Sequence, residues 1–364
     1  MLKQKVLAVV RGKNQMDKKS FILKAHLFEN GIKISVEAKE ILNAQSEKWF
    51  MDDGYITCTG ITIKFADQYI TTNVRPDSEY ELAVIEGKLA VSDGMGNQFN
   101  ASVIFPPDYM KGNIVIRGKK ITKYVNTYTD RIRLQTMYGC ANSCKFCNAK
   151  ESGYNFNDIE GLDEAFQIAL AQSDVRHAFI STNNVKDEEG FKKLTKTIEY
   201  FGIKYPYMGL DLMTSPRGFT SYTDSSQYKP YLEHIKSVGI HGIAANLELN
   251  NPDKLKFFCP EKAIIGQENY LKFIEHSVEI FGMDSVRSML IVGLEALEET
   301  LKGVEKLAER GCNPVLTPLF PYGEAQGDTT ASLYIEAKSK SEEICEKHGV
   351  KMGPLCKPCS YNCL

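Results

Sequence analysis

The stretch Tyr138-Gly139-Cys140-Ala141-Asn142-Ser143-Cys144-Lys145-Phe146-Cys147-Asn148 carries three cysteines at C-x-x-x-C-x-x-C spacing, directly after an alternating apolar run. A tight loop of this kind can turn three thiolates toward one metal group. Iron–sulfur clusters are held by cysteine thiolates, and a four-iron cluster with three protein ligands leaves one iron open. Structural zinc is the less favoured alternative, because such sites normally have four protein ligands and no fourth Cys or His lies nearby in sequence.

The chain from Arg131 onward alternates between strand-like runs and helical patterns, which favours a parallel sheet with right-handed crossovers. Strands are expected at Ile132–Met137, His177–Ser181, Tyr207–Met213, Ile240–Leu247, Val286–Val292 and Pro314–Phe320. Helices are expected at Asp163–Gln172, Glu188–Tyr200, Tyr228–Val238, Asn269–Phe281 and Leu297–Arg310. The fold class is therefore α/β, a partial (β/α)6 TIM-like barrel with ligands at the carboxyl ends of its strands.

Residues 1–115 show a different pattern, in which short alternating segments are separated by Asp53-Gly54 and Asp93-Gly94. Alternation with Asp-Gly turns is typical of a small antiparallel β domain. Its segments are Ile32–Val36, Tyr55–Thr59, Ile61–Phe65 and Leu89–Ser92, and Phe105–Asp108 reads as a linker. We therefore predict an N-terminal β-rich module at 1–115, a barrel at 125–325, and a tail at 326–364 with a helix near Ala331–Lys347 and a cysteine-rich end.

Composition places further limits on function. The chain has 364 residues, 43% of them hydrophobic, and a net charge of -2, which gives no electrostatic reason to expect nucleic acid as a partner. No apolar run approaches the roughly 20 residues that span a bilayer, and no secretory signal is recognisable, so we expect a cytoplasmic protein without membrane contact. Disulfides are rare in the cytoplasm, and six of the ten cysteines fall in two tight clusters.

The cysteine loop, with the aromatic Phe146 before its third cysteine and its place after the first of six strands, resembles the radical S-adenosylmethionine superfamily. The resemblance implies that Cys140, Cys144 and Cys147 hold a [4Fe-4S] cluster whose open iron binds S-adenosylmethionine. It also implies an electron donor such as flavodoxin or ferredoxin. Reductive cleavage of the cofactor in that family gives a 5′-deoxyadenosyl radical, which abstracts hydrogen from a small-molecule or peptide substrate.

The same resemblance implies further cofactor contacts. Family members often carry Gly-Gly-Glu after the second strand, where this chain has Ser181-Thr182-Asn183-Asn184, so Ser181 and Asn183 are the candidates there. Ala245-Asn246-Leu247-Glu248 resembles the Asn-x-Asp/Glu element of biotin synthase and lipoyl synthase. Alternation puts Asn246 and Glu248 on one face of a strand.

The fifth strand supplies the last candidates of this group. Gly293 resembles the glycine of a segment that packs against adenine, and its missing side chain would permit close approach. Arg287 is expected at the cofactor site, and Arg287 and Arg217 could also clamp a substrate carboxylate. The alternative for Glu248 is a structural ion pair with Arg287. Cys259 is either a ligand, a thiyl-forming residue or a buried inert thiol.

The tail holds the second cluster of cysteines, Cys356-Lys357-Pro358-Cys359-Ser360-Tyr361-Asn362-Cys363. Three alternatives fit this run: a second iron–sulfur cluster, a zinc knuckle and a redox thiol pair. Many enzymes of the resembled superfamily carry an auxiliary cluster near the carboxyl terminus, which favours the cluster. Its fourth ligand could be Cys345, Cys312, substrate, or none.

The nearest resemblance within the superfamily is to the biotin synthase and lipoyl synthase branch. It implies sulfur insertion into, or rearrangement of, a small acid. The alternatives are radical modification of a peptide recognised by the N-terminal module, and a non-catalytic iron–sulfur carrier.

Overall fold

The structure is a computed structural model that describes residues 18–52, 59–93, 96–216 and 225–364. The expected Asp53-Gly54 turn, nearly all of the Tyr55–Thr59 segment, Gly94 and Arg217 lie outside the described residues.

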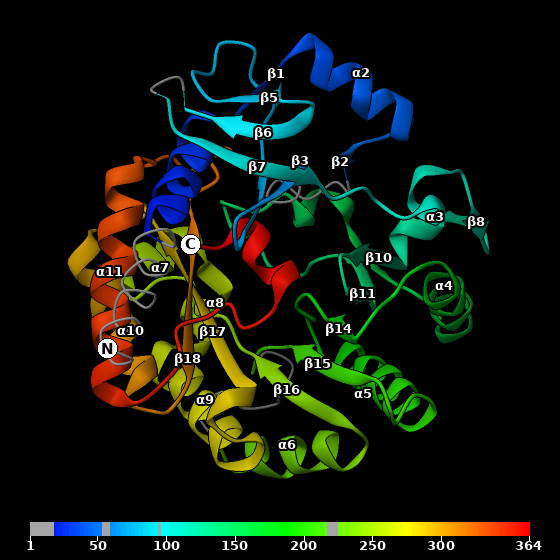
Figure 1. The fold of residues 1–364 in the computed structure, drawn as a ribbon. Helices are drawn as coiled ribbons and strands as arrows, with labels where there is room; N and C mark the ends of the chain where they lie inside the picture. Colours follow the sequence, from blue (N-terminus) through cyan, green and yellow to red (C-terminus); the bar gives the residue numbers. More distant parts are fainter. Residues whose placement is uncertain (1–17, 53–58, 94–95, 217–224) are drawn as a thin grey trace, which may run out of the picture.

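Six parallel strands form the central sheet, and spatial neighbours follow the order of the chain. They are β11 (Arg131–Gln135), β14 (His177–Ser181), β15 (Gly209–Met213), β16 (Ile240–Ala244), β17 (Val286–Val292) and β18 (Asn313–Pro318), and β10 (Val125–Tyr128) pairs antiparallel with β11 at one edge. The strands curl around a common interior with helices outside (Figure 1), an α/β arrangement consistent with a partial TIM-like barrel. Each of the six strands overlaps the range that alternation predicts.

The outer helices bury one apolar face against this sheet. They are α4 (Ile159–Gln172), α5 (Glu188–Lys204), α6 (Tyr228–Ser237), α9 (Gln267–Phe281), α10 (Leu297–Ala308) and α11 (Ala331–His348). Asp158 and Asp187 cap the amino ends of α4 and α5, because their carboxylates accept the N–H groups of Gly161 and Gly190.

Two short helices between β16 and α9 were not predicted, namely α7 (Pro252–Phe258) and α8 (Pro260–Ile265). Each begins with a proline, a residue whose fixed φ suits the first helical turn. Seven and six residues are too short to show helical periodicity in the sequence.

The N-terminal part is a seven-stranded sheet with two helices. Its strands are β1 (Lys33–Ile34), β2 (Phe50–Asp52), β3 (Thr59–Phe65), β4 (Gln68–Thr72), β5 (Glu81–Ile85), β6 (Lys88–Ser92) and β7 (Gln98–Val103), and its helices cover residues 18–30 and α2 (Val36–Gln45). The pairings β2–β3, β3–β4, β3–β7, β5–β6 and β6–β7 are antiparallel, as expected for this part, whereas β1 pairs parallel with β5. The expected Ile32–Val36 strand stops early because the Ser35 hydroxyl caps α2 by accepting the N–H of Ala38.

The helix at residues 18–30 joins the N-terminal sheet to the barrel. Phe21 and Ala25 pack in the barrel core, whereas Leu23 and Leu27 pack in the core of the N-terminal sheet. The expected Phe105–Asp108 linker runs directly into α3 (Asp108–Lys111), whose Tyr109 also lies in the barrel core. Short strands β8 (Val115–Ile116) and β9 (Lys119–Lys120) and a turn η2 (Ile121–Lys123) then lead to β10.

The tail closes the open side of the barrel. The Leu364 N–H donates to the Leu316 carbonyl at 2.9 Å, and the Thr317 hydroxyl donates to the Asn362 carbonyl at 2.8 Å. The turn η6 (Lys357–Asn362) therefore lies beside β18, in the gap that faces β10 and β11 (Figure 1). Tyr361 stacks on Tyr69 of β4, so the N-terminal sheet covers the tail. None of the helices in the described ranges has the length and apolarity needed to cross a membrane.

Candidate active site

A two-stranded ribbon clamps the base of the first cysteine loop. β12 (Met137–Gly139) pairs antiparallel with β13 (Tyr154–Phe156), and the Cys140 N–H donates to the Gly153 carbonyl at 3.0 Å. Gly139 has φ +95°, and a Cβ there would lie 1.9 Å from the Gly153 oxygen. The Asn183 amide donates to the carbonyls of Met137 and Gly139. The sequence thus forms a rigid base from which the three cysteines project.

All three sulfurs face one cavity of about 330 Å³. The N–H groups of Asn142 and Ala149 donate to the sulfurs of Cys140 and Cys147, each at 3.4 Å. Burial raises the pKa of Cys147 to about 11 and also raises the pKa of Cys140. Without metal these two thiols stay protonated near neutral pH, so a metal must displace their protons on binding.

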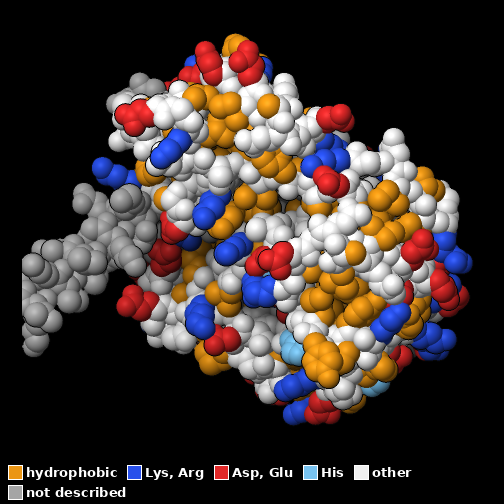
Figure 2. Space-filling view, turned by 45° about the vertical axis from the view of Figure 1, so that its right-hand side comes forward, with side chains coloured by type: hydrophobic (Ala, Val, Ile, Leu, Met, Phe, Trp, Pro, Cys, Tyr) orange, Lys and Arg blue, Asp and Glu red, His pale blue; other side chains and the backbone are white. Residues whose placement is uncertain are grey.

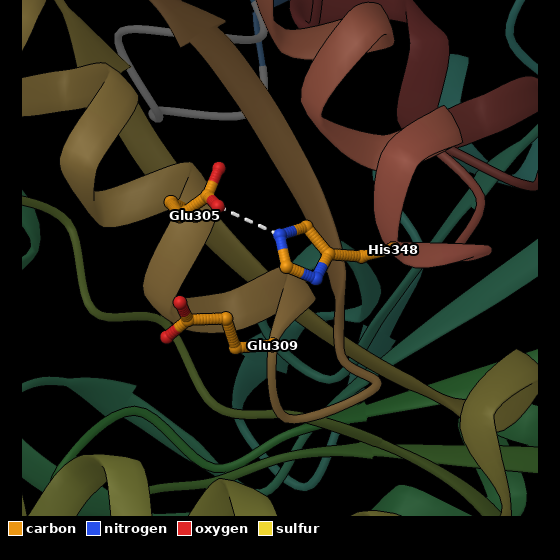
Figure 3. Close-up of side chains that lie close together, drawn as sticks. All are labelled: Glu305, Glu309 and His348. Atoms are coloured by element: carbon orange, nitrogen blue, oxygen red, sulfur yellow. Dashed lines mark hydrogen bonds and ion pairs between the residues drawn. The ribbon is translucent and has the colours of Figure 1, made fainter.

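Within the described ranges, the group of three Cys, His, Asp or Glu residues whose donor atoms all lie within 4.8 Å of one another is Glu305, Glu309 and His348. The Glu305, Glu309 and His348 group lies on α10 and at the end of α11, outside the cavity (Figure 3). Its central carboxylate, that of Glu305, is already paired at 2.7 Å with both His348 and Lys347. These ion pairs explain why the three side chains lie close together without a bound metal.

Asn142 is the clearest sign of a bound ligand in the first loop. Its side chain is only 4% exposed and lines the cavity, and neither its amide oxygen nor its amide nitrogen has a hydrogen-bond partner. Buried amide atoms are nearly always satisfied, so this amide calls for a polar group in the cavity.

The predicted Asn246 and Glu248 pair also lines the cavity, beside a lysine that the sequence did not single out. Lys262 of α8 is 6% exposed, and its ammonium donates to the Glu248 carboxylate at 2.8 Å and to the Asn246 carbonyl at 2.7 Å. Burial alone lowers the pKa of Lys262, but the Glu248 charge outweighs it and the pKa is raised above its usual value. Lys262 therefore keeps its positive charge inside the barrel.

The alternative prediction, an ion pair between Glu248 and Arg287, is wrong. Arg287 instead pairs with Asp211 of β15 at 3.1 Å, in the interior of the barrel. Its guanidinium and that of Arg131 lie over the Phe179 ring, at 5.2 and 5.0 Å from the centroid. Arg287 lines the cavity with one buried, unpartnered N–H group, which keeps it a candidate for anion binding.

The second cysteine triplet contributes Cys359 and Cys363 to the wall of the same cavity. The Cys356 and Cys359 sulfurs are 2.8 Å apart, and the Arg131 guanidinium donates to Cys359 at 2.7 Å. Cys359 has a pKa well below its usual value, because the Cys356 thiol donates to it and the two arginines Arg131 and Arg287 stabilise its negative charge. The tail thus presents a thiol with a lowered pKa at the cavity wall.

The remaining candidates are placed as follows. Phe146 and Asn183 line the cavity, whereas Ser181 and Gly293 are not among its lining residues. The Arg133 guanidinium donates to the Ser181 hydroxyl at 3.4 Å. At Gly293 the missing side chain makes room for the protein's own backbone rather than for a cofactor. A Cβ there would lie 2.1 Å from the Asp328 carbonyl oxygen. The suggested fourth ligands Cys312 and Cys345 lie in the barrel core, not at the cavity wall.

Sequence reasoning missed three residues of the site: Asn142, Arg131 and Lys262. A signal existed for Arg131, which lies at the start of an alternating run in a strand that parallel packing should keep apolar on both faces. Lys262 gave no such signal, because α8 is too short to show helical periodicity in the sequence.

Comparisons with known proteins give only distant likenesses. No protein-family model and no curated protein matches the chain. A radical SAM methyltransferase from Sphaerobacter thermophilus is similar in structure, with a TM-score of 0.42 and 13% identity over 80% of this chain and 76% of that chain. The FeFe-hydrogenase maturase HydG from Carboxydothermus hydrogenoformans has a TM-score of 0.43 and 18% identity over 59% of this chain and 51% of its own.

A thermostable chitinase domain from Pyrococcus furiosus is also among the similar structures, with a TM-score of 0.33 and 10% identity over 54% of this chain and 69% of that domain. At these low TM-scores the likenesses carry no argument about activity. The function has to be argued from the residues themselves.

Proposed function

We propose that the protein is a radical S-adenosylmethionine enzyme that acts on a small acid held in the barrel. The observation that carries the proposal is the cysteine loop, whose three sulfurs and unsatisfied Asn142 amide face one cavity with Glu248 and Lys262. A [4Fe-4S] cluster with bound S-adenosylmethionine would supply a 5′-deoxyadenosyl radical for hydrogen abstraction.

The residues around the first triplet fit the proposed cofactor. Cys140, Cys144 and Cys147 would hold the cluster, and the loop offers no fourth protein ligand. Glu248 presents a carboxylate suited to an ammonium group or ribose hydroxyls, and Asn246 presents an amide to the same cavity. Lys262 holds the Glu248 carboxylate in place through its hydrogen bond, and the Asn142 amide offers both a donor and an acceptor. Phe146 and Ile291 supply apolar surface that helps to exclude water.

Sulfur insertion or rearrangement is the finer proposal, and the position of the second triplet supports it. Because both triplets contribute to one cavity wall, a substrate bound there could contact the first metal site as well as Cys359 and Cys363. A second iron–sulfur cluster in the tail would supply sulfide or accept an electron. Arg287 offers an N–H group to a substrate carboxylate.

Two alternatives remain open to test. Thr71 of the N-terminal sheet reaches the cavity wall, which favours modification of a peptide docked on that sheet as the second candidate. A non-catalytic carrier would not need a cavity with an unsatisfied amide and a buried Glu248–Lys262 pair.

Lys, Arg, Asp and Glu side chains are mixed over the described surface in Figure 2, so that face offers nucleic acid no patch of positive charge alone.

Anaerobic reconstitution tests the proposal. Iron, sulfide and zinc are counted in the wild type, in Cys140/Cys144/Cys147→Ala and in Cys356/Cys359/Cys363→Ala, and 5′-deoxyadenosine is measured with dithionite and S-adenosylmethionine, then with reduced flavodoxin or ferredoxin. We expect about eight irons in the wild type and about four in either variant, as for two four-iron clusters. Only the first variant should lose cofactor cleavage entirely.

Iron binding in the wild type without 5′-deoxyadenosine would favour the carrier and contradict the enzyme. A wild-type protein with about four irons and retained zinc would remove the second cluster but leave the first.

A further inference from the structure

Two arginines lie over one aromatic ring in the wall of the cavity. Arg131 begins β11 and is 7% exposed, and Arg287 lies on β17 with its side chain 18% exposed. Their guanidinium carbons are 5.0 and 5.2 Å from the centroid of the Phe179 ring on β14. All three side chains line the cavity. The two cations are therefore neighbours in one part of it.

Each guanidinium has an N–H group that no protein atom accepts. Arg131 donates through Nη1 to the Cys359 sulfur at 2.7 Å, and its Nε has no hydrogen-bond partner among the described residues. Arg287 donates through Nη1 to the Asp211 carboxylate at 3.1 Å, and its Nη2 likewise lacks a partner there. Buried donors are nearly always hydrogen-bonded, so these two indicate a missing acceptor.

The tail adds a third donor of the same kind. Tyr361 follows Cys359 by two residues, lines the cavity and is 5% exposed. Its ring stacks on Tyr69, but its hydroxyl has no hydrogen-bond partner in the part of the chain that the structure describes. The stacking holds the ring in place while the hydroxyl stays available.

Charge indicates which acceptor would complete these donors. The two guanidiniums and the Asp211 carboxylate together carry one net positive charge, and a buried charge is costly unless an opposite charge compensates it. A carboxylate brings one negative charge and two oxygens that accept several hydrogen bonds. Arginine binds it well, because the planar guanidinium matches its geometry.

We propose that Arg131, Arg287 and Tyr361 form the binding site for the carboxylate group of the substrate acid. The tail then takes part in substrate recognition as well as in closing the barrel, since Tyr361 supplies a donor from η6. The inference rests on the proposed function for the role of this ligand as the substrate. The carboxylate site itself requires neither a metal cluster nor S-adenosylmethionine, so the two proposals can fail separately.

Binding of butyrate tests the site, with butyramide as the uncharged control of similar shape and inorganic phosphate as a second oxyanion. The rise in thermal unfolding temperature with ligand concentration gives the affinity at constant ionic strength. It is measured in the reconstituted protein without S-adenosylmethionine and in the metal-free protein. We expect butyrate to stabilise both samples, phosphate to stabilise them less, and butyramide to have no effect.

Three variants remove one donor each. Arg131→Met, Arg287→Met and Tyr361→Phe should each weaken butyrate binding by about tenfold or more, because each loses a hydrogen bond to a charged group. Tyr361→Phe keeps the aromatic ring and its stacking on Tyr69, so it still tests the site if an arginine variant folds poorly.

Two matched variants serve as controls. Arg176→Met removes an arginine whose side chain is 64% exposed and paired with Asp130, outside the cavity. Tyr109→Phe removes a buried hydroxyl that does not line the cavity. Both should bind butyrate with the affinity of the wild type.

Equal stabilisation by butyrate and butyramide, or wild-type affinity in Tyr361→Phe and in both arginine variants, would overturn the site. Tighter binding of phosphate than of butyrate would overturn the assignment to a carboxylate. Loss of iron in Arg131→Met with unchanged butyrate affinity would assign that guanidinium to the tail sulfurs instead. A protein that binds butyrate as expected but forms no 5′-deoxyadenosine would overturn the proposed function and leave the carboxylate site standing.

Discussion

Lys262 shows how a single buried charge can hold the site in place. Its ammonium is enclosed and pairs with Glu248, which is 8% exposed. A buried ion pair adds little net stability, but removing one partner leaves an uncompensated charge.

Lys262→Met should therefore lower the free energy of unfolding by about 3–5 kcal/mol, because Glu248 then stays buried without a partner. The double variant Lys262→Met/Glu248→Gln should recover most of this loss. Chemical denaturation of both single variants and the double variant completes the cycle. If the loss of unfolding free energy in the double variant equals the sum of the losses in the two single variants, the two side chains do not stabilise each other.

The residues of the site differ in how far the sequence reveals them. Cys140, Cys144 and Cys147 are recognisable because their spacing is local. Asn246 and Glu248 were predicted from strand alternation, and both line the cavity, but they lie beyond the end of β16 at Ala244 and Glu248 has a positive φ of 71°. Lys262 could not be paired with Glu248 from the sequence, because the contact depends on how α8 folds back over the end of β16. The partner predicted for Glu248, Arg287, lies deeper in the barrel and pairs with Asp211.

At the scale of elements, the ribbon of β12 and β13 decides whether the three cysteines can converge. Gly139 combines a positive φ with a backbone contact that leaves no room for a side chain.

Gly139→Ala should separate the ribbon and reduce iron uptake at the first triplet by at least half, since the added Cβ would clash with the Gly153 carbonyl. Gly87→Ala is the matched control: Gly87 also has a positive φ, at +75°, but open space around its Cα. Iron content and thermal unfolding distinguish the two. Equal iron uptake in both variants would mean that the ribbon does not position the cysteines.

The sequence also predicts elements unevenly. The barrel strands were placed well because each is a short apolar run followed by a helical pattern. The helix at Val36–Gln45 was missed because the segment Ile32–Val36 alternates like a strand, whereas the Ser35 cap starts a helix at Val36. The helix at residues 18–30 was also not predicted. Whether residues 1–115 behave as a separate module stays a prediction.

At the scale of the whole molecule, Lys24 connects the first described helix to the tail. Its ammonium donates to the Ser360 carbonyl at 2.8 Å, and burial lowers its pKa to about 7, with Lys338 adding to the effect and Cys363 and Asp67 opposing it. When the pKa of a lysine is lower in the folded protein than in the unfolded chain, the unfolded chain binds the proton more tightly. The free energy of unfolding is then reduced at pH values where the unfolded chain carries this proton.

The contribution of Lys24 to stability should therefore be least favourable below pH 7 and improve as the pH rises from about 7 to 10.5, the usual lysine value. Lys24→Met should remove this pH dependence and be more stable than the wild type at pH 6, with the difference shrinking toward pH 10. Denaturation at several pH values measures it, and Lys19→Met, an exposed position on the same helix, is the control. A difference that stays constant with pH would contradict the lowered pKa.

The tail that closes the barrel has a consequence for metal loading. Residues 349–364 are far from the first cysteine loop in sequence, yet they form part of the wall of the cavity that this loop lines. A movement of the tail would therefore change how open the first metal site is to solvent and to an iron donor, without any change in the loop itself.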